Sequence, residues 1–460
     1  MKKEHFCCWI LSLVSLTCYP QRGFCAKDLP QSAGPGSSVV APDPPVPPQT
    51  PGNNVTRLTL AQAEQLALRN NPQITVSKLL TFAERQVVRE ARSAELPIAT
   101  GNLTAVDSHN GTRITAGVLN NPSVFDRAAG GLTLGQLITD FGRTRNLVAS
   151  SKYREQAQQY AERATTADVT LAVDQAFYRA LAAQQQLLVA QQTVNTRQTT
   201  VDQVQALTQA RLKSDLDLSF AKVNLAQAQL LLLDAQNGKD SAFANLNELL
   251  GFEKQTTYLL IDETGKPLEQ PPPDEQALAN MALRSRPDLA ELDDQWQAAQ
   301  RFARAEHDLN RPTISALGAV GGTPVRADQI TSSWYGAVGV NMSVPIFNGF
   351  LFHSRAQEAE YRSSALQQQV RDLRDRIARD VRVTWLQANT AYRRVSVTQQ
   401  LLQQANLALD LAQTRYKLGL GSIVELSQAQ LQQTDAQIGN TNARYDYLST
   451  ISELNYQTGR

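Results

Sequence analysis

Cysteine is confined to the start of this sequence. The four cysteines of the 460-residue chain all precede Ala26, at Cys7, Cys8, Cys18 and Cys25. The sequence after Cys25 has no thiol with which to form a disulfide bond. Disulfides therefore contribute nothing to the stability of the part of the chain that remains after cleavage near Cys25 or Ala26.

Residues that carry catalysis or bind metals are scarce. The three methionines include the initiator, which disfavours a methionine-lined copper path. The chain has no glycine-rich phosphate loop and no Gly-x-Ser-x-Gly turn. The histidines have no metal-ligand spacing and lie far apart, at His5, His109, His307 and His353. We therefore expect no catalytic, cofactor-binding or metal-binding site, and no enzyme.

An excess of charge of one sign and long apolar runs are also missing. The 44 Lys and Arg against 43 Asp and Glu give a formal net charge of +1, which does not favour a nucleic-acid partner. No segment reaches the roughly 18 consecutive apolar residues of a membrane-spanning helix. An α-helical membrane protein is therefore excluded.

Residues 1–26 have the pattern of a secretory signal peptide. Two lysines precede an apolar run from Phe6 to Val14, and small and polar residues follow up to about Ala26. Lipid attachment at Cys18 is the alternative, although residues 15–17 fit a lipoprotein signal poorly. Both interpretations export the chain from the cytoplasm.

Proline and glycine divide the rest of the chain. Eight of the 20 prolines lie between 27 and 51, so residues 27–57 are predicted to form an extended, solvated linker. Proline is then absent from 123–266 and from 346–460, and 143–250 contains a single glycine. Such segments, rich in Ala, Gln, Leu and Arg, are predicted to form very long helices.

The sequence is internally duplicated. Residues 67–72 match residues 282–287 at an offset of 215, and an offset of 208 then holds without a gap from Phe177 and Trp385 to Gly251 and Gly459. We predict a first repeat at 58–251, an inter-repeat linker at 252–273 and a second repeat at 274–460. Each repeat is expected to be a supersecondary unit of a helix, a β-hairpin and a long helical hairpin.

Each repeat contains one hairpin with a period of two. The strands are predicted at about 98–106 and 131–138 in the first repeat, and at about 313–320 and 334–344 in the second. The polar loops between them, 107–127 and 321–333, are expected to face the cell exterior. The last strand has an apolar face made of Trp334, Gly336, Val338, Val340, Met342 and Val344.

Strands of about nine residues can cross an outer membrane when tilted. Trp334 and Tyr335, at a strand end, suit an aromatic belt at the membrane interface. A small sheet in a soluble protein is the other interpretation. Four strands cannot close a barrel and an open edge cannot face lipid, so a membrane barrel requires several chains, and three chains give twelve strands.

Residues spaced by seven follow each hairpin, which is typical of a coiled coil. A second seam of small residues, interrupted by Arg197, would let helices approach closely. At about 1.5 Å per residue, a helix over 143–213 is a rod of roughly 100 Å, and the chain returns as a second helix after a turn. The first seams are Val173, Ala180, Leu187, Val194 and Val201, then Val381, Ala388, Val395, Leu402 and Leu409.

These features together resemble the outer membrane factor (TolC) family over residues 58–459. The resemblance rests on the signal peptide, the duplication, one hairpin per copy and four motifs. The motifs are Thr139-Asp140-Phe141-Gly142, Pro345-Ile346-Phe347-Asn348-Gly349, the stretch from Thr414 to Leu426, and Asn442-Ala443-Arg444-Tyr445-Asp446-Tyr447-Leu448.

The resemblance implies an α+β fold built mainly of long helices. In that family a homotrimer forms a 12-stranded β-barrel in outer membrane lipid, continued by a periplasmic α-helical barrel. The channel docks onto a periplasmic adaptor (membrane fusion protein) and an inner-membrane transporter. It is the exit duct of a tripartite efflux pump or a type I secretion system.

The resemblance also suggests a periplasmic gate. Glu425 falls where the family has an acidic ring, which favours cations. Gln428 stands where relatives carry a second acid, and Gly421 where some carry a basic residue. Tyr416 and Asp217 match positions linked to the closed state. The alternative for Glu425 is an ordinary charge at a helix start.

The turns at 212–218 and 418–426 match the adaptor-docking surface of the family, which includes Leu212, Ser214, Leu420 and Ser422. A periplasmic coiled-coil adaptor, or a structural protein of an export complex, is the alternative function. An adaptor would need a β-rich lipoyl-like domain flanking a single helical hairpin, whereas this chain offers two helical hairpins.

Overall fold

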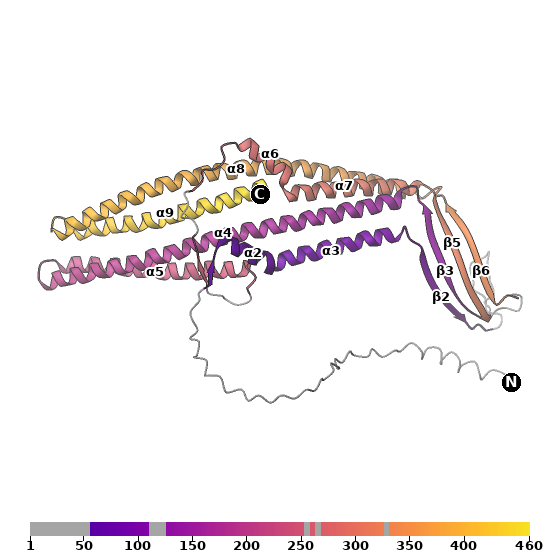
Figure 1. Cartoon of the computed structure of the whole chain (residues 1–460), viewed down its shortest axis with the longest axis horizontal. Coiled ribbons are helices and arrows are strands. Elements are labelled where there is room, and N and C mark those ends of the chain that lie inside the picture. Colours follow the sequence, from indigo (N-terminus) through magenta and orange to yellow (C-terminus); the bar gives the residue numbers. More distant parts are fainter. Residues whose placement is uncertain (1–55, 110–125, 253–257, 263–267, 326–330) are drawn as a thin grey trace, which may run out of the picture. The chain divides into compact units, whose positions relative to one another are not determined.

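The computed structural model describes residues 56–109, 126–252, 258–262, 268–325 and 331–460 (Figure 1). The predicted signal peptide and nearly all of the linker at 27–57 lie outside these ranges. Parts of the predicted loops 107–127 and 321–333 and of the inter-repeat linker lie outside them as well.

The elements follow one another in the same order twice (Figure 1). The first series is β1 (Thr56–Leu58), α2 (Leu60–Asn70), α3 (Pro72–Ser93), β2 (Ile98–Val106), β3 (Arg127–Thr139), α4 (Arg143–Gln209) and α5 (Asp215–Leu249). The second is β4 (Tyr258–Leu260), α6 (Glu275–Ser285), α7 (Pro287–His307), the 3₁₀ turn η1 (Asp308–Asn310), β5 (Thr313–Val325), β6 (Trp334–Ser343), α8 (Leu351–Lys417) and α9 (Ile423–Thr458).

The predicted long helices are confirmed, since α4 and α8 each run for 67 residues. Their first-seam positions are buried or half-buried, and Val173, Ala180, Val381 and Ala388 are fully inaccessible to solvent. Alanine in such a seam lets the backbones of neighbouring helices approach closely. None of the helices in the described ranges combines the length and the apolarity needed to cross a membrane.

Local signals set where the shorter helices begin. Asn71 caps α3 by accepting the N–H of Gln73 at 2.9 Å, and Pro72 occupies the first helical position. Pro287 takes the equivalent place in α7. Both helices stop before the prolines that precede β2 and β5, because a residue before proline is driven out of the helical region.

The four longer strands form one antiparallel sheet in the order β2-β3-β5-β6. Two predicted bounds were too short: β3 begins at Arg127, and β5 continues to Val325, so residues 321–325 belong to a strand and not to a loop. The sequence did not predict these extensions because they contain glycines, and glycine weakens a strand. The ring of Tyr335 lies over Gly131 and Gly321, where any Cβ would clash with it.

The two faces of this sheet differ in polarity. The register places Leu134 beside Gly318 and Val338 on one face, which exposes large apolar side chains. The other face carries more polar groups, such as Thr133, which accepts a hydrogen bond from Asn102 Nδ2 at 3.3 Å. Period-two alternation therefore gives one apolar and one mixed face, as the sequence predicted for β6.

Among the described residues, two apolar clusters hold the helices together in the middle of the bundle, and a third lies near the ends of the long helices. The first gathers around α2, α4 and the end of α5, and the second around α6, α7 and α8. α9 contributes Tyr445 to the first and Leu454 to the second. β1 and β4 pair in parallel and add Leu58, Tyr258 and Leu260 to the first cluster.

The alanine seam provides a test of packing. Ala180 is fully buried on α4, so Ala180→Leu forces extra methylenes into a filled space and should destabilise the protein by about 1–3 kcal/mol. Thermal unfolding followed by circular dichroism measures this. Ala206→Leu, at an exposed position of the same helix, is the control. Equal unfolding temperatures for the two variants would mean that the seam is not tightly packed.

Candidate functional site

The two helical hairpins end in short connections, called here the first tip (residues 210–214) and the second tip (residues 418–422). Each tip places one residue in the left-handed region, Arg211 with φ 57° and Gly419 with φ 74°. The next N–H in each tip then donates to the carbonyl five residues earlier at 2.8 Å. Both helices therefore end in the same type of C-cap, a Schellman motif.

The first tip ends in a reciprocal cap. Ser214 Oγ accepts the N–H of Asp217 at 3.2 Å, and Asp217 Oδ2 accepts the N–H of Ser214 at 3.2 Å. Such a capping box satisfies two backbone donors at the start of α5. The carboxylate of Asp217, a predicted gate residue, is thus held in the cap of its own helix.

The second tip keeps only half of this cap. Ser422 Oγ accepts the N–H of Glu425 at 3.1 Å, but the carboxylate of Glu425 accepts from Arg415 Nε at 3.0 Å. Arg415 Nη2 also donates to the carbonyl of Leu420 at 3.3 Å. A Cβ on Gly421 would lie only 3.2 Å from Glu425 Oε2. The carboxylate of Glu425 therefore pairs with the last turn of α8 and not with the N-cap of its own helix.

Tyr416 joins the two tips. Its side chain is buried, and Lys213 Nζ lies 4.4 Å from the centroid of its ring in a cation–π contact. Burial, and to a smaller extent the charge of Asp217, raises the pKa of Tyr416. The surrounding cluster takes residues from both repeats: Val201, Val204, Ala221, Tyr416, Ile423 and Leu426.

The remaining tip residues are exposed. Leu212 and Leu420 have 70% and 68% of their surface in solvent. Ser214 and Ser422 are exposed as well, although their hydroxyl groups cap helices. Gln428 lies exposed on α9, and none of the described residues forms a hydrogen bond with its side chain.

The two predicted membrane-interface aromatics lie apart from the tips, in β6, and on opposite faces of the sheet. Trp334 is on the apolar face and is 68% exposed. Tyr335 lies on the mixed face, over glycines of β3 and β5. They therefore contact different surroundings, although they are adjacent in sequence.

Sequence reasoning missed two basic residues at the tips, Arg415 and Lys213. Gly421 stands where some relatives carry a basic residue, whereas the structure pairs Glu425 with Arg415, in the last turn of α8. A basic residue in the last turn of a helix that precedes an acidic helix start was the available signal.

A second polar centre lies where α2 meets the long helices. Glu64 on α2 shares a hydrogen bond with Asp174 on α4. Burial, followed by the charge of Asp174 and this hydrogen bond, raises the pKa of Glu64 to about 7. Burial also raises the pKa of Asp174, although a hydrogen bond from Ser452 opposes it. Both carboxyl groups therefore hold their protons more tightly than exposed carboxyl groups do.

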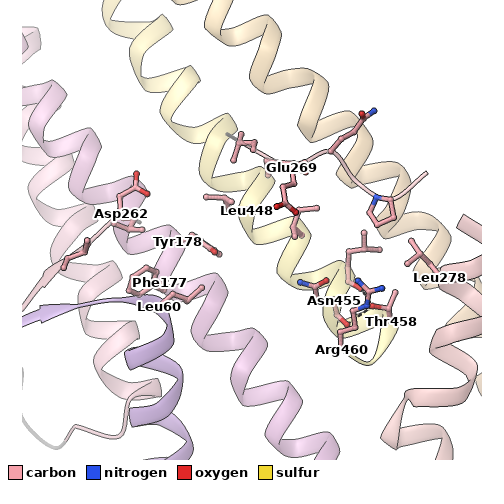
Figure 2. Close-up of a pocket in the computed structure, with 18 residues that line it drawn as sticks. Leu60, Phe177, Tyr178, Asp262, Glu269, Leu278, Leu448, Asn455, Thr458 and Arg460 are labelled. Atoms are coloured by element: carbon pink, nitrogen blue, oxygen red, sulfur yellow. Dashed lines mark hydrogen bonds between the residues drawn. The ribbon is translucent and has the colours of Figure 1, made fainter. Parts of the chain in front are cut away.

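A cavity of about 570 Å³ lies nearby, between α4, α9 and the segments on either side of residues 263–267 (Figure 2). Phe177 and Tyr178 line it from α4, and Asp262 and Glu269 from those segments. Among the described residues, no cluster of three or more His, Cys, Asp or Glu side chains is placed to hold a metal ion.

The carboxyl pair makes stability depend on pH. The folded-state pKa of Glu64 lies above its ordinary value of 4.5, so the folded chain binds this proton more tightly than the unfolded chain. Stability should then fall as pH rises from about 4.5 to about 7 and level off above that. Glu64→Gln should flatten this decline and unfold at a higher temperature than the parent at pH 8.

Thermal unfolding at pH 5, 6, 7 and 8 measures this effect. Glu90→Gln, at an exposed position on α3, should keep the decline of the parent. A Glu64→Gln profile that stays parallel to the parent would show that the pKa of Glu64 is not raised in the folded chain.

Comparisons with known proteins agree with this architecture. Residues 63–252 and 278–460 match the family described as "Outer membrane efflux protein". The chain is 24% identical to "Outer membrane protein TolC" of Salmonella enteritidis over 428 residues, 87% of this chain and 83% of that protein. It is 23% identical to "Proteases secretion protein PrtF" of Dickeya chrysanthemi over 337 residues, 68% of this chain and 69% of that protein.

Solved structures share the fold. A crystal structure of CusC, in a study of its folding and transmembrane channel formation, superimposes with a TM-score of 0.77 at 19% identity. The alignment covers 87% of this chain and 92% of that one. The matches to the family and to the relatives span both series of elements. The chain therefore belongs to the outer membrane efflux protein family, and it is an outer membrane exit duct for efflux or type I secretion and not an enzyme.

Proposed function

We propose that three copies of this chain close around an axis to form a 12-stranded β-barrel in the outer membrane, continued by an α-helical barrel in the periplasm. The observation that carries this proposal is the open sheet. Within the described residues, β2 and β6 each have one edge without a partner strand. Unpaired edges are not tolerated in lipid, and pairing β6 with β2 of the next copy satisfies both.

The arrangement of the helices also supports closure into a ring. Next to the sheet they follow the order α3, α4, α7, α8, and toward the tips the order α5, α4, α9, α8. The outermost helices expose rows of large apolar side chains, which mark protein interfaces. These are Val76, Leu80 and Val87 on α3, Leu216, Phe220, Val223 and Leu230 on α5, and Val383, Leu386, Val397 and Leu401 on α8.

In this assembly the apolar face of the sheet contacts lipid, and Trp334 lies in the interfacial belt. The mixed face, with Tyr335, lines the lumen. The connections between β2 and β3 and between β5 and β6 face the cell exterior. Residues 1–26 export the chain, 27–57 and 252–273 are linkers, and the repeats span 58–251 and 274–460.

Assembly can be tested on the α3 edge. Leu80 is 51% exposed in the single chain, so Leu80→Glu should leave the fold of one copy intact while placing a charge in the interface. Native mass spectrometry of detergent-extracted protein should give trimers for the parent and mainly monomers for this variant. Lys78→Glu, on the opposite side of the helix, should remain trimeric. A parent chain that is monomeric in detergent contradicts the proposal.

The second tip is proposed to be the periplasmic gate, with Glu425, Gln428, Tyr416 and Asp217 near the constriction. Three copies bring three Glu425 carboxylates around one axis, which favours cations. Arg415 neutralises part of this charge. Because both side chains are about half exposed, the pair contributes only about 0.2–1 kcal/mol and can open readily.

Channel recordings separate these two residues. Glu425→Gln should lower cation preference and weaken block by multivalent cations in planar bilayers, since it removes three negative charges per trimer. Arg415→Gln should change both properties in the opposite direction. Glu360→Gln, at an exposed position near the start of α8, is the control. Block that is unchanged in Glu425→Gln would show that no acidic ring exists at the tip.

Both tips are proposed to dock a periplasmic adaptor that connects the channel to an inner-membrane transporter. Exposed Leu212 and Leu420 supply apolar contact area, and the caps formed by Ser214 and Ser422 fix the backbone around them. A preformed backbone reduces the entropy lost on binding. The geometry at the tips thus suits a rigid docking surface.

A further inference from the structure

One buried cation is unexplained by the channel architecture. Arg197 occupies the small-residue seam of α4, which otherwise continues through Ala176, Ala183 and Ala190. Its side chain is buried, with 6% of the residue exposed. At the equivalent position of α8, 208 residues later, stands Ala405. The second repeat therefore has an apolar residue at this position, whereas the first repeat has a charged one.

Arg197 has no partner among the described residues. It forms no hydrogen bond or ion pair with them, and its Nη1 atom is buried. Burial lowers the pKa of its guanidinium to about 10, so the group remains a cation at neutral pH. An uncompensated buried charge is strongly destabilising. A counter-charge beside the guanidinium would remove this cost.

A small cavity beside Arg197 can hold that counter-charge. It has a volume of about 90 Å³, enough for an ion and a few waters, since one water occupies about 30 Å³ of liquid. No carboxylate lines it, and the amides of Gln192 and Gln437 have no hydrogen-bond partner among the described residues. The other lining residues are Thr193, Thr196, Leu409, Gln430, Gln433 and Thr434.

We propose that this cavity is a binding site for one small monovalent anion, of the chloride class, held by Arg197 and neighbouring glutamine amides. A single guanidinium balances one negative charge, so a divalent anion would leave excess charge buried. The cavity lies between α4, α8 and α9, so the bound anion links helices of both repeats. The site does not depend on the channel function.

Anion-dependent stability tests the site. The full chain in detergent should unfold about 2 °C or more higher in sodium chloride or bromide than in sodium gluconate at the same ionic strength. Arg197→Met should lose this difference and should be at least as stable as the parent in gluconate, because no unpaired charge remains. Arg374→Met, which removes an exposed arginine of α8, should keep the difference.

Crystals of the parent chain soaked in bromide provide a readout that needs no variant. An anomalous peak beside Arg197 supports the site directly. Equal unfolding temperatures of the parent in halide and gluconate, a halide effect that persists in Arg197→Met, or the absence of bromide density at Arg197 would each overturn the proposal.

Discussion

Close approach of long helices along seams of small residues is the constraint on which the structure depends. A helix of 67 residues cannot bury itself, so its stability comes from packing along its length against neighbours. Fully buried Ala180 and Ala388 let that contact occur in both repeats. The order of the strands in the sheet follows from this helix packing. The four helices that pack side by side are joined directly to the four paired strands.

The two tips have the same backbone conformation but differ in the contacts of their acidic side chains. Ser214 and Ser422 cap their helices in the same way. A shorter carboxylate, Asp217, folds back to complete the first cap, whereas the longer Glu425 reaches Arg415 instead. One methylene and one arginine thus replace the reciprocal cap by a partly exposed ion pair. The carboxylate of the first tip is bonded within its own helix cap, whereas the carboxylate of the second tip is bonded to the preceding helix.

Much of the architecture could be predicted from the sequence, because absence of proline and glycine, heptad spacing and proline before a strand are local signals. The bounds of β2 and the start of α3 follow from such signals. The lengths of β3 and β5 do not, because both strands contain glycines, and a tyrosine ring from another strand occupies the space beside two of them. The candidate gate residues came from resemblance. Their contacts with Arg415 and Lys213 required the tip geometry, since no pattern specifies how a turn directs its side chains.

The parallel pair of β1 and β4 has a consequence for the order of folding. β1 opens the first series of elements, yet its partner is made roughly 200 residues later, and contacts so distant in sequence form slowly. The first apolar cluster also takes Tyr445 from α9. The first repeat therefore cannot complete its core while it emerges on its own. Until α9 has been synthesised, apolar surface of α2 and α4 stays exposed. The two repeats therefore complete their folding together.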